Sequence, residues 1–176
     1  MKAHVIVKTH EVALKGKNRP WFMRQLADNL RAATRGAGVE SVWQGQMLVG
    51  LTLVDESAWP VVAQRVKDCF GVAKYFKAYQ APKDLGKVKA LLPGLLEGRQ
   101  FASFRITANR ADKRFPLDSP EINRDLGKYI QDLTGARVDL EHPDLTIFLD
   151  VLPRWILIYF QEERGYGGLP VGVSGV

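Results

Sequence analysis

Apolar and polar side chains alternate at the start of the chain, in AHVIVKTH (residues 3–10), and this alternation predicts a β-strand. Phe22, Leu26, Leu30 and Ala33 follow at spacings of four, four and three residues, which predicts one buried face of a helix. The next segments predict a hairpin over residues 39–54 with its turn at QGQ, a second helix over 56–70 and a closing strand over 71–80. This βαββαβ order is typical of a ferredoxin-like domain.

The second half of the chain has a different order of elements. Apolar stripes predict two helices, one with Leu85, Val88, Leu92 and Leu95 and one with Ile122, Leu126, Ile130 and Leu133. Ser119 is the expected N-cap of the latter. Strands are predicted over residues 100–108, 144–151 and 154–161, and the tail from residue 163 is predicted to be a loop or linker. We therefore expect an α+β protein with a ferredoxin-like domain in residues 1–80, an α/β domain in 81–165 and a glycine-rich linker in 166–176.

Positive charge is concentrated in particular parts of the chain. Residues 1–80 carry 12 Lys and Arg against 6 Asp and Glu, whereas residues 81–176 carry 13 of each. Within this neutral half, residues 99–128 carry 7 basic against 4 acidic side chains. Segregated positive charge is typical of a surface that binds a polyanion.

Several other classes of protein are disfavoured. No apolar run approaches the roughly 20 residues needed to cross a bilayer, so a membrane partner is not expected. The N-terminus lacks the apolar core and cleavage site of a secretory signal. The single cysteine, Cys69, excludes an internal disulfide and fits a reducing compartment. The expected location is the cytoplasm.

The most basic stretch is RITANRADKRFPLDSPE, residues 105–121, just before a predicted helix. In that helix Arg124 and Lys128 would lie one turn apart on one face. The preceding loop adds Arg110, Lys113 and Arg114, with Asn109 and Phe115 between them. Cations around a helix N-terminus, interleaved with an amide and an aromatic ring, suit phosphates and unstacked bases. A loop that charge merely keeps solvated is the alternative.

Several separated motifs then resemble one protein family. FRITANRADKRFPLDSPEINRDLG resembles the RNA-binding core of the THUMP domain in the tRNA sulfurtransferases that make 4-thiouridine. EVALKGKNRPWF resembles the start of the N-terminal ferredoxin-like domain of the same enzymes, and CFGVAKYFKAY and GYGGLPVG also fit. The resemblance runs in order along effectively the whole chain.

The resemblance implies that this region holds tRNA, including its acceptor end, so that the uridine at position 8 reaches a catalytic domain. The residues expected to bind RNA are Arg105, Asn109, Arg110, Lys113, Arg114, Phe115, Arg124 and Lys128, with Lys15, Lys17 and Arg19 as a second basic patch in the first domain. Phe115 would pack either under a base or under its own loop. The resemblance also implies a homodimer, a cysteine desulfurase as partner, and in some members a role in thiazole synthesis for thiamine.

No catalytic or metal site is expected within these 176 residues. The family, as the resemblance implies, adenylates the uridine with ATP and Mg²⁺ and then transfers sulfur from a cysteine persulfide. The ATP step needs an SGGxDS-type phosphate loop, which the sequence lacks. Cys69 is expected to be a small buried hydrophobe, His4, His10 and His142 lack metal-ligand spacing, and Asp150 is expected on a solvated strand face.

Two other interpretations stay open at this point. One is a free-standing RNA-binding adaptor that recruits a separate tRNA-modifying enzyme. The other is a small-ligand regulatory domain, because ferredoxin-like folds often bind metabolites; it rests on analogy of fold alone.

Overall fold

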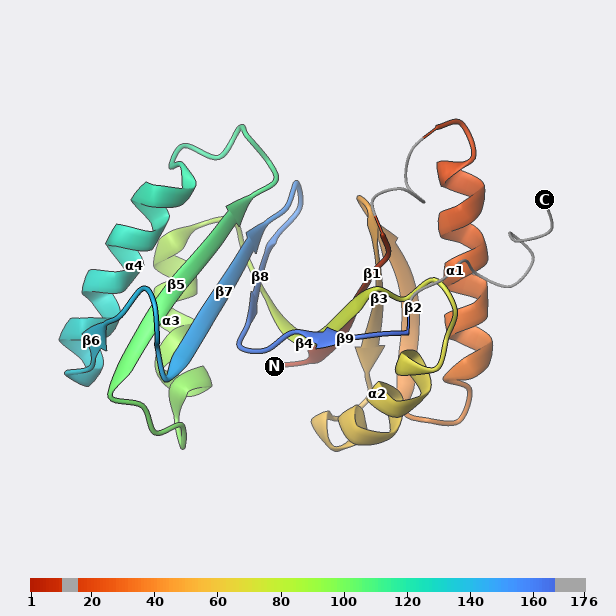
Figure 1. Cartoon of the computed structure of the whole chain (residues 1–176), viewed down its shortest axis with the longest axis horizontal. Helices are drawn as coiled ribbons and strands as arrows, with labels where there is room; N and C mark the ends of the chain where they lie inside the picture. Colours follow the sequence, from red (N-terminus) through yellow and green to blue (C-terminus); the bar gives the residue numbers. More distant parts are fainter. Residues whose placement is uncertain (11–15, 167–176) are drawn as a thin grey trace. The chain divides into compact units, whose positions relative to one another are not determined.

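The computed structural model describes residues 1–10 and 16–166. It contains two compact units, one formed by the described residues of 1–78 together with 162–166 and the other by residues 79–161 (Figure 1). Strand β4 (Lys74–Ala81) contributes residues to both units. Within the described part of the chain, no helix is long and apolar enough to span a membrane.

The first unit has the predicted βαββαβ order. Its elements are β1 (Ala3–Lys8), α1 (Arg19–Ala33), β2 (Val39–Gly45), β3 (Leu48–Leu53), the 3-10 helix η2 (Glu56–Ala58), α2 (Trp59–Lys67), residues 74–78 of β4, and β9 (Glu163–Arg164). The strands run in the order β2-β3-β1-β4, with β1 and β2 antiparallel to β3. Helix α1 packs on β2 and β3, and α2 packs on β1.

Two boundaries in this unit differ from the prediction. The hairpin turn lies at Gln46 and Met47, rather than at QGQ, and Met47 adopts a positive φ of 64°. Helix α2 ends at Lys67 instead of residue 70. Its predicted last turn contained Asp68, Cys69 and Phe70, of which Phe70 is exposed and so adds nothing to the buried face.

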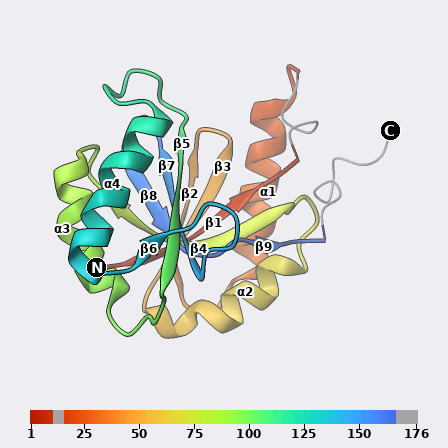
Figure 2. The ribbon, with the colours of Figure 1, turned by 60° about the vertical axis from the view of Figure 1, so that its left-hand side comes forward.

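The second unit is an α/β arrangement. It contains residues 79–81 of β4, then α3 (Leu85–Leu96), β5 (Ser103–Arg110), α4 (Ser119–Thr134), β6 (Arg137–Val138), β7 (Leu145–Val151) and β8 (Ile156–Tyr159). The strand order is β4-β8-β7-β5-β6, with β5 parallel to both β6 and β7 and the other pairs antiparallel. Helices α3 and α4 lie side by side (Figure 2) and share one hydrophobic core with the strands.

The buried stripes of the two helices are close to those predicted. In α4 the side chains of Ile122, Leu126 and Ile130 are fully buried, but Leu133 is 44% exposed. In α3 the buried position of the last turn is Leu96, whereas Leu95 is only partly buried. Each stripe therefore packs on the core as expected: Leu95 is partly buried against it, and only Leu133 was placed wrongly.

The start of α4 is fixed by a capping box one residue earlier than predicted. The N-cap is Asp118, and Ser119 is the first helical residue. The Asp118 carboxylate accepts from the Glu121 amide at 2.9 Å, and the Glu121 carboxylate accepts from the Asp118 amide at 3.2 Å. Two orphan amide groups of the first turn are thereby satisfied, which orients the loop that enters the helix.

Two further predictions were wrong. The tail from residue 163 begins with a short strand, β9, which pairs with Lys74 and Tyr75 of β4. Asp150 is buried instead of solvated, and its carboxylate accepts a hydrogen bond from the Tyr159 hydroxyl at 3.2 Å. The remainder of the predicted linker, residues 167–176, lies outside the described residues.

Candidate nucleic-acid interface

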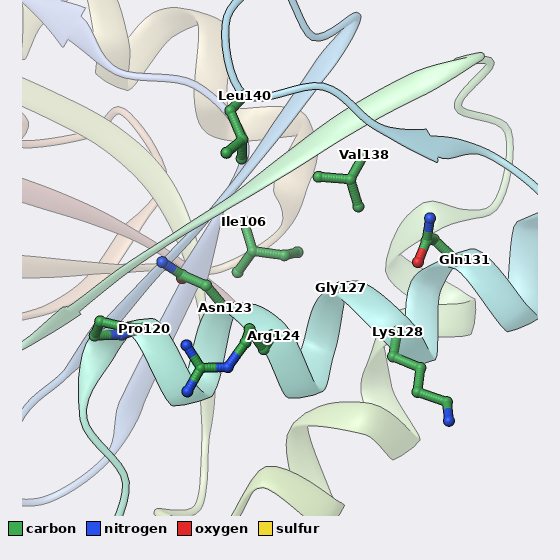
Figure 3. A pocket seen from close by; sticks show the side chains of 9 residues that line it. All are labelled: Ile106, Pro120, Asn123, Arg124, Gly127, Lys128, Gln131, Val138 and Leu140. Carbon is green, nitrogen blue, oxygen red and sulfur yellow. The ribbon is translucent and has the colours of Figure 1, made fainter.

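One side of α4 borders a groove with a volume of about 450 Å³. Its opposite wall is formed by the sheet edge and the segment that follows β6, so that Ile106, Val138 and Leu140 lie across from the helix (Figure 3). The helix lines the groove with Pro120, Asn123, Arg124, Gly127, Lys128 and Gln131. The wall residues are apolar and the helix residues are largely polar or cationic, so the groove has two chemically distinct sides.

Gly127 lies in the middle of the helical wall and keeps the groove open. A β-carbon built at this position would meet only Val138 Cγ2, at 3.9 Å. A methyl group would therefore fit, whereas a longer side chain would extend into the space between the helix and Val138. The glycine thus determines how much of the groove is free for a ligand.

Arg124 and Lys128 supply the positive charge of the groove. Both are exposed and project from α4, as the helical spacing predicted. Among the described residues neither forms a salt bridge. Cations without an acidic partner leave a net positive field that attracts an anion.

The basic loop, residues 111–118, leads directly into α4 and is held by hydrogen bonds. The Asp112 amide donates to the Val151 carbonyl at 2.9 Å, and the Arg110 guanidinium donates to the Phe115 carbonyl at 3.1 Å. Lys113 is exposed and Arg114 is paired with Asp112. The loop enters α4 at its N-terminus, where the helix carries a partial positive charge that also favours an anion.

Phe115 is buried, with 6% of its surface exposed, and belongs to the hydrophobic core of the second unit. Of the two alternatives for this ring, the structure shows packing beneath the loop. The ring offers no stacking surface for a base in this conformation. By packing into the core, the ring anchors the basic loop.

Arg105 supports the groove without lining it. Its guanidinium donates to the Leu140 carbonyl at 3.0 Å and to Thr146 Oγ1 at 3.5 Å, and its buried Nε has no hydrogen-bond partner in the described part of the chain. Side chains alternate along β5, and Phe104 and Ile106 face the helical core, so Arg105 lies on the other face of the sheet. It holds the segment that carries Leu140.

The remaining predicted residues are placed as follows. Asn109 is exposed at the end of β5. Lys17 and Arg19 are exposed in the first unit, around the start of α1. Lys15 lies outside the described residues. The structure brings Arg124 and Lys128 into one groove and Lys113 and Arg114 into the adjoining loop, which follows Arg110 at the end of β5.

Two features of the site were not predicted from the sequence: the apolar wall of the groove and the buried Asp112 in the basic loop. Val138 and Leu140 stand in a segment without periodicity, so no pattern marked them. Asp112 is almost fully buried, although an aspartate among Arg110, Lys113 and Arg114 is expected to be solvated. The signal that could have found it is an acid directly before two consecutive cations, Lys113 and Arg114.

Cys69 is half-buried, so the expectation of a buried thiol is only partly met. Burial raises the pKa of this thiol, and the charge of Asp68 raises it further. Within the described ranges, no group of three His, Cys, Asp or Glu side chains could hold a metal ion.

This raised pKa predicts slow alkylation of Cys69. The thiolate is the reactive form, so a raised pKa leaves less of it at any pH below that value. We expect iodoacetamide to label Cys69 more slowly than free cysteine at pH 8. The rate should still climb above pH 9, where the rate for a free thiol with a pKa of about 8.5 levels off. Rapid stoichiometric labelling at pH 7 would contradict this.

Two family models match the chain. The ThiI ferredoxin-like domain matches residues 4–75 and the THUMP domain matches residues 84–161. Curated relatives described as probable tRNA sulfurtransferases include one from Thermus thermophilus, 45% identical over 94% of this chain, and one from Coxiella burnetii, 37% identical over 99%. The chain spans 41% and 46% of their lengths, less than half in each case.

Solved structures also match nearly the whole chain. A crystal structure of a 4-thiouridine synthetase–RNA complex with bound ATP matches with a TM-score of 0.78 and 29% identity, over 98% of this chain and 44% of that one. PH1313 from Pyrococcus horikoshii Ot3 matches with a TM-score of 0.82 and 26% identity, over 98% of this chain and 58% of that one.

Proposed function

The chain belongs to the family of proteins that join a ThiI ferredoxin-like domain to a THUMP domain, and we propose that it is the tRNA-binding part of a tRNA sulfurtransferase that forms 4-thiouridine at position 8. The observation that carries this proposal is the groove beside α4, with two exposed cations on one side and an apolar wall on the other. Relatives that match nearly the whole of this chain are described as probable tRNA sulfurtransferases, which favours this function over a metabolite-binding regulatory domain.

The groove suits an unpaired nucleotide of the acceptor end. Arg124 and Lys128 would bind its phosphates, and Ile106, Val138 and Leu140 would contact the base and ribose. The oxygen of the Asn123 amide accepts from the Ala108 amide at 3.0 Å, and no described residue accepts from its N–H groups, so these can donate to a polar edge of the ligand. In this arrangement the cations attract the phosphates, and the apolar wall packs against the base.

The chemistry would be performed by parts outside these residues. The 176 residues contain no SGGxDS-type phosphate loop, so adenylation of the uridine with ATP and Mg²⁺ would need a catalytic domain of the longer protein. The role of this chain is to hold the tRNA while that domain acts. We further propose that it works in the cytoplasm, as a homodimer, with a cysteine desulfurase as sulfur source.

A pair of substitutions at Gly127 tests the groove without changing charge. Gly127→Ala should fit beside Val138 and stabilise α4 by about 0.5–1 kcal/mol, because glycine is unfavourable inside a helix. It should bind tRNA like the parent. Gly127→Leu should fill the groove and weaken tRNA binding, while circular dichroism shows a folded protein. The measurement is a tRNA titration with all three proteins. Equal affinity for all three would show that the ligand does not enter the groove.

A further inference from the structure

Asp112 is a buried carboxylate inside the basic loop, next to the cations Lys113 and Arg114 and two residues after Arg110 at the end of β5. Only 6% of its surface is exposed, although its neighbours Lys113 and Arg114 are exposed. Burying a charged group is unfavourable unless it is paired and hydrogen-bonded. The surroundings of Asp112 therefore need to explain why an acid occupies this position.

Two cations from separate segments hold this carboxylate. Arg114 Nε donates to Oδ1 at 2.9 Å and Arg114 Nη2 donates to Oδ2 at 3.4 Å, while Lys83 Nζ donates to Oδ2. Lys83 also donates to the Pro153 carbonyl at 3.2 Å. Asp112 thus ties together the segment before α3, the basic loop and the turn between β7 and β8. The hydrogen bonds from Arg114 and Lys83 hold its pKa well below the ordinary range, so it is charged at any pH at which tRNA binds.

The hydrogen bonds of Asp112 fix the orientation of Arg114. Its side chain is 79% exposed, yet one edge of the guanidinium is fixed by two hydrogen bonds to Asp112. The Arg114 amide also donates to Asp112 Oδ1 at 3.2 Å, which fixes the backbone beside it. The other terminal nitrogen, Nη1, forms no hydrogen bond with a described residue. An arginine held along one edge presents the other to a phosphate in a defined orientation.

We propose that Asp112 is a positioning residue of the RNA site, which holds Arg114 ready to bind a phosphate of the tRNA backbone. This inference rests on the proposed function and adds to it a residue that does not itself touch RNA. Ordering a long side chain before binding removes part of the entropic cost of binding. The carboxylate thereby strengthens binding of an anion although it carries the same charge as that anion.

The direction in which tRNA affinity changes when the charge of Asp112 is removed tests this proposal. If Asp112 acts only as a charge, Asp112→Asn removes a repulsion and tightens tRNA binding. If it positions Arg114, the same substitution weakens binding by about two- to tenfold, which is the cost of ordering one free side chain. Affinity is measured by tRNA titration at fixed salt, with thermal unfolding to confirm that each variant is folded. Tighter binding by Asp112→Asn overturns the proposal.

A double-mutant cycle separates positioning from general damage to the loop. In an Arg114→Ala background, Asp112→Asn should no longer change tRNA affinity, because the side chain through which it acts is gone. An equal loss in both backgrounds would show that Asp112 is merely structural. Arg114→Lys gives a second measurement that does not depend on the stability of Asp112→Asn. It keeps the charge but loses the planar fork, so tRNA binding should weaken by about two- to tenfold. Parental affinity in this variant overturns the proposal.

Binding by the parent protein separates a failure of the proposed function from a failure of the role of Asp112. If the parent binds tRNA with a salt dependence and the cycle shows no coupling, the proposed function stands and the role of Asp112 is wrong. If the parent shows no salt-dependent binding of tRNA, the proposed function is wrong and the role of Asp112 falls with it.

Discussion

Replacing Arg124 and Lys128 together with alanine is expected to weaken tRNA binding by roughly 25-fold at 0.1 M salt. Each cation that neutralises a phosphate of a single strand contributes about −0.7 to the slope of log affinity against log salt, so losing both should flatten that slope by about 1.4. Neither residue forms a salt bridge within the described part of the chain, and both are exposed, so the fold should survive. The measurement is a tRNA titration at several salt concentrations.

Two control variants test whether a change in slope is due to loss of charge at the groove. Exchanging the two residues, Arg124→Lys with Lys128→Arg, keeps both charges and should keep the slope. Lys87→Ala removes an exposed charge from α3, away from the residues that line the groove, and should leave the slope unchanged. If the alanine double variant binds with the slope of the parent, the cations of α4 are only a solvated surface and the groove is not the phosphate site.

The second large effect concerns stability. Leu126→Ala should lower the free energy of unfolding by about 2–5 kcal/mol, because Leu126 is fully buried in the core of the second unit. Leu133→Ala is the matched control on the same helix. Leu133 is 44% exposed, so its truncation should change the free energy of unfolding by no more than about 0.5 kcal/mol. Urea titrations of both variants and the parent make the comparison. Equal losses would mean that Leu133 is buried after all.

The comparison of Leu126 with Leu133 also shows what periodicity can predict. The spacing of apolar residues in α4 correctly identified the side that faces the sheet. It could not show where the neighbouring core ends, because that depends on elements far away in the sequence. The helix ends at Thr134, with Gly135 in the left-handed conformation as its C-cap, and its last apolar residue is left partly exposed.

The candidate site was predictable to a similar extent. Arg124 and Lys128 could be placed on one face because helical spacing is a local property. The wall formed by Val138 and Leu140 depends on a return of the chain to the sheet edge, which no local pattern records. Asp112 depends on Lys83, which lies 29 residues away in the sequence. Strand β9 has only two residues, too few for an alternating pattern to be recognised.

The pairing of β9 with β4 has a consequence for the order in which the protein can be completed on the ribosome. Lys74 and Tyr75 of β4 are synthesised early, but their partners in the first unit, Arg164 and Glu163, follow only after the whole second unit has been made. Gly165 then closes the pairing, since its amide donates to the Ala73 carbonyl at 3.0 Å and a β-carbon there would lie 2.3 Å from the Val72 carbonyl oxygen. Domains generally fold in turn from the N-terminus, and an unpaired strand edge invites association with other chains. While about 80 further residues of the second unit are translated, the edge of β4 at Lys74 and Tyr75 therefore lacks its β9 partner.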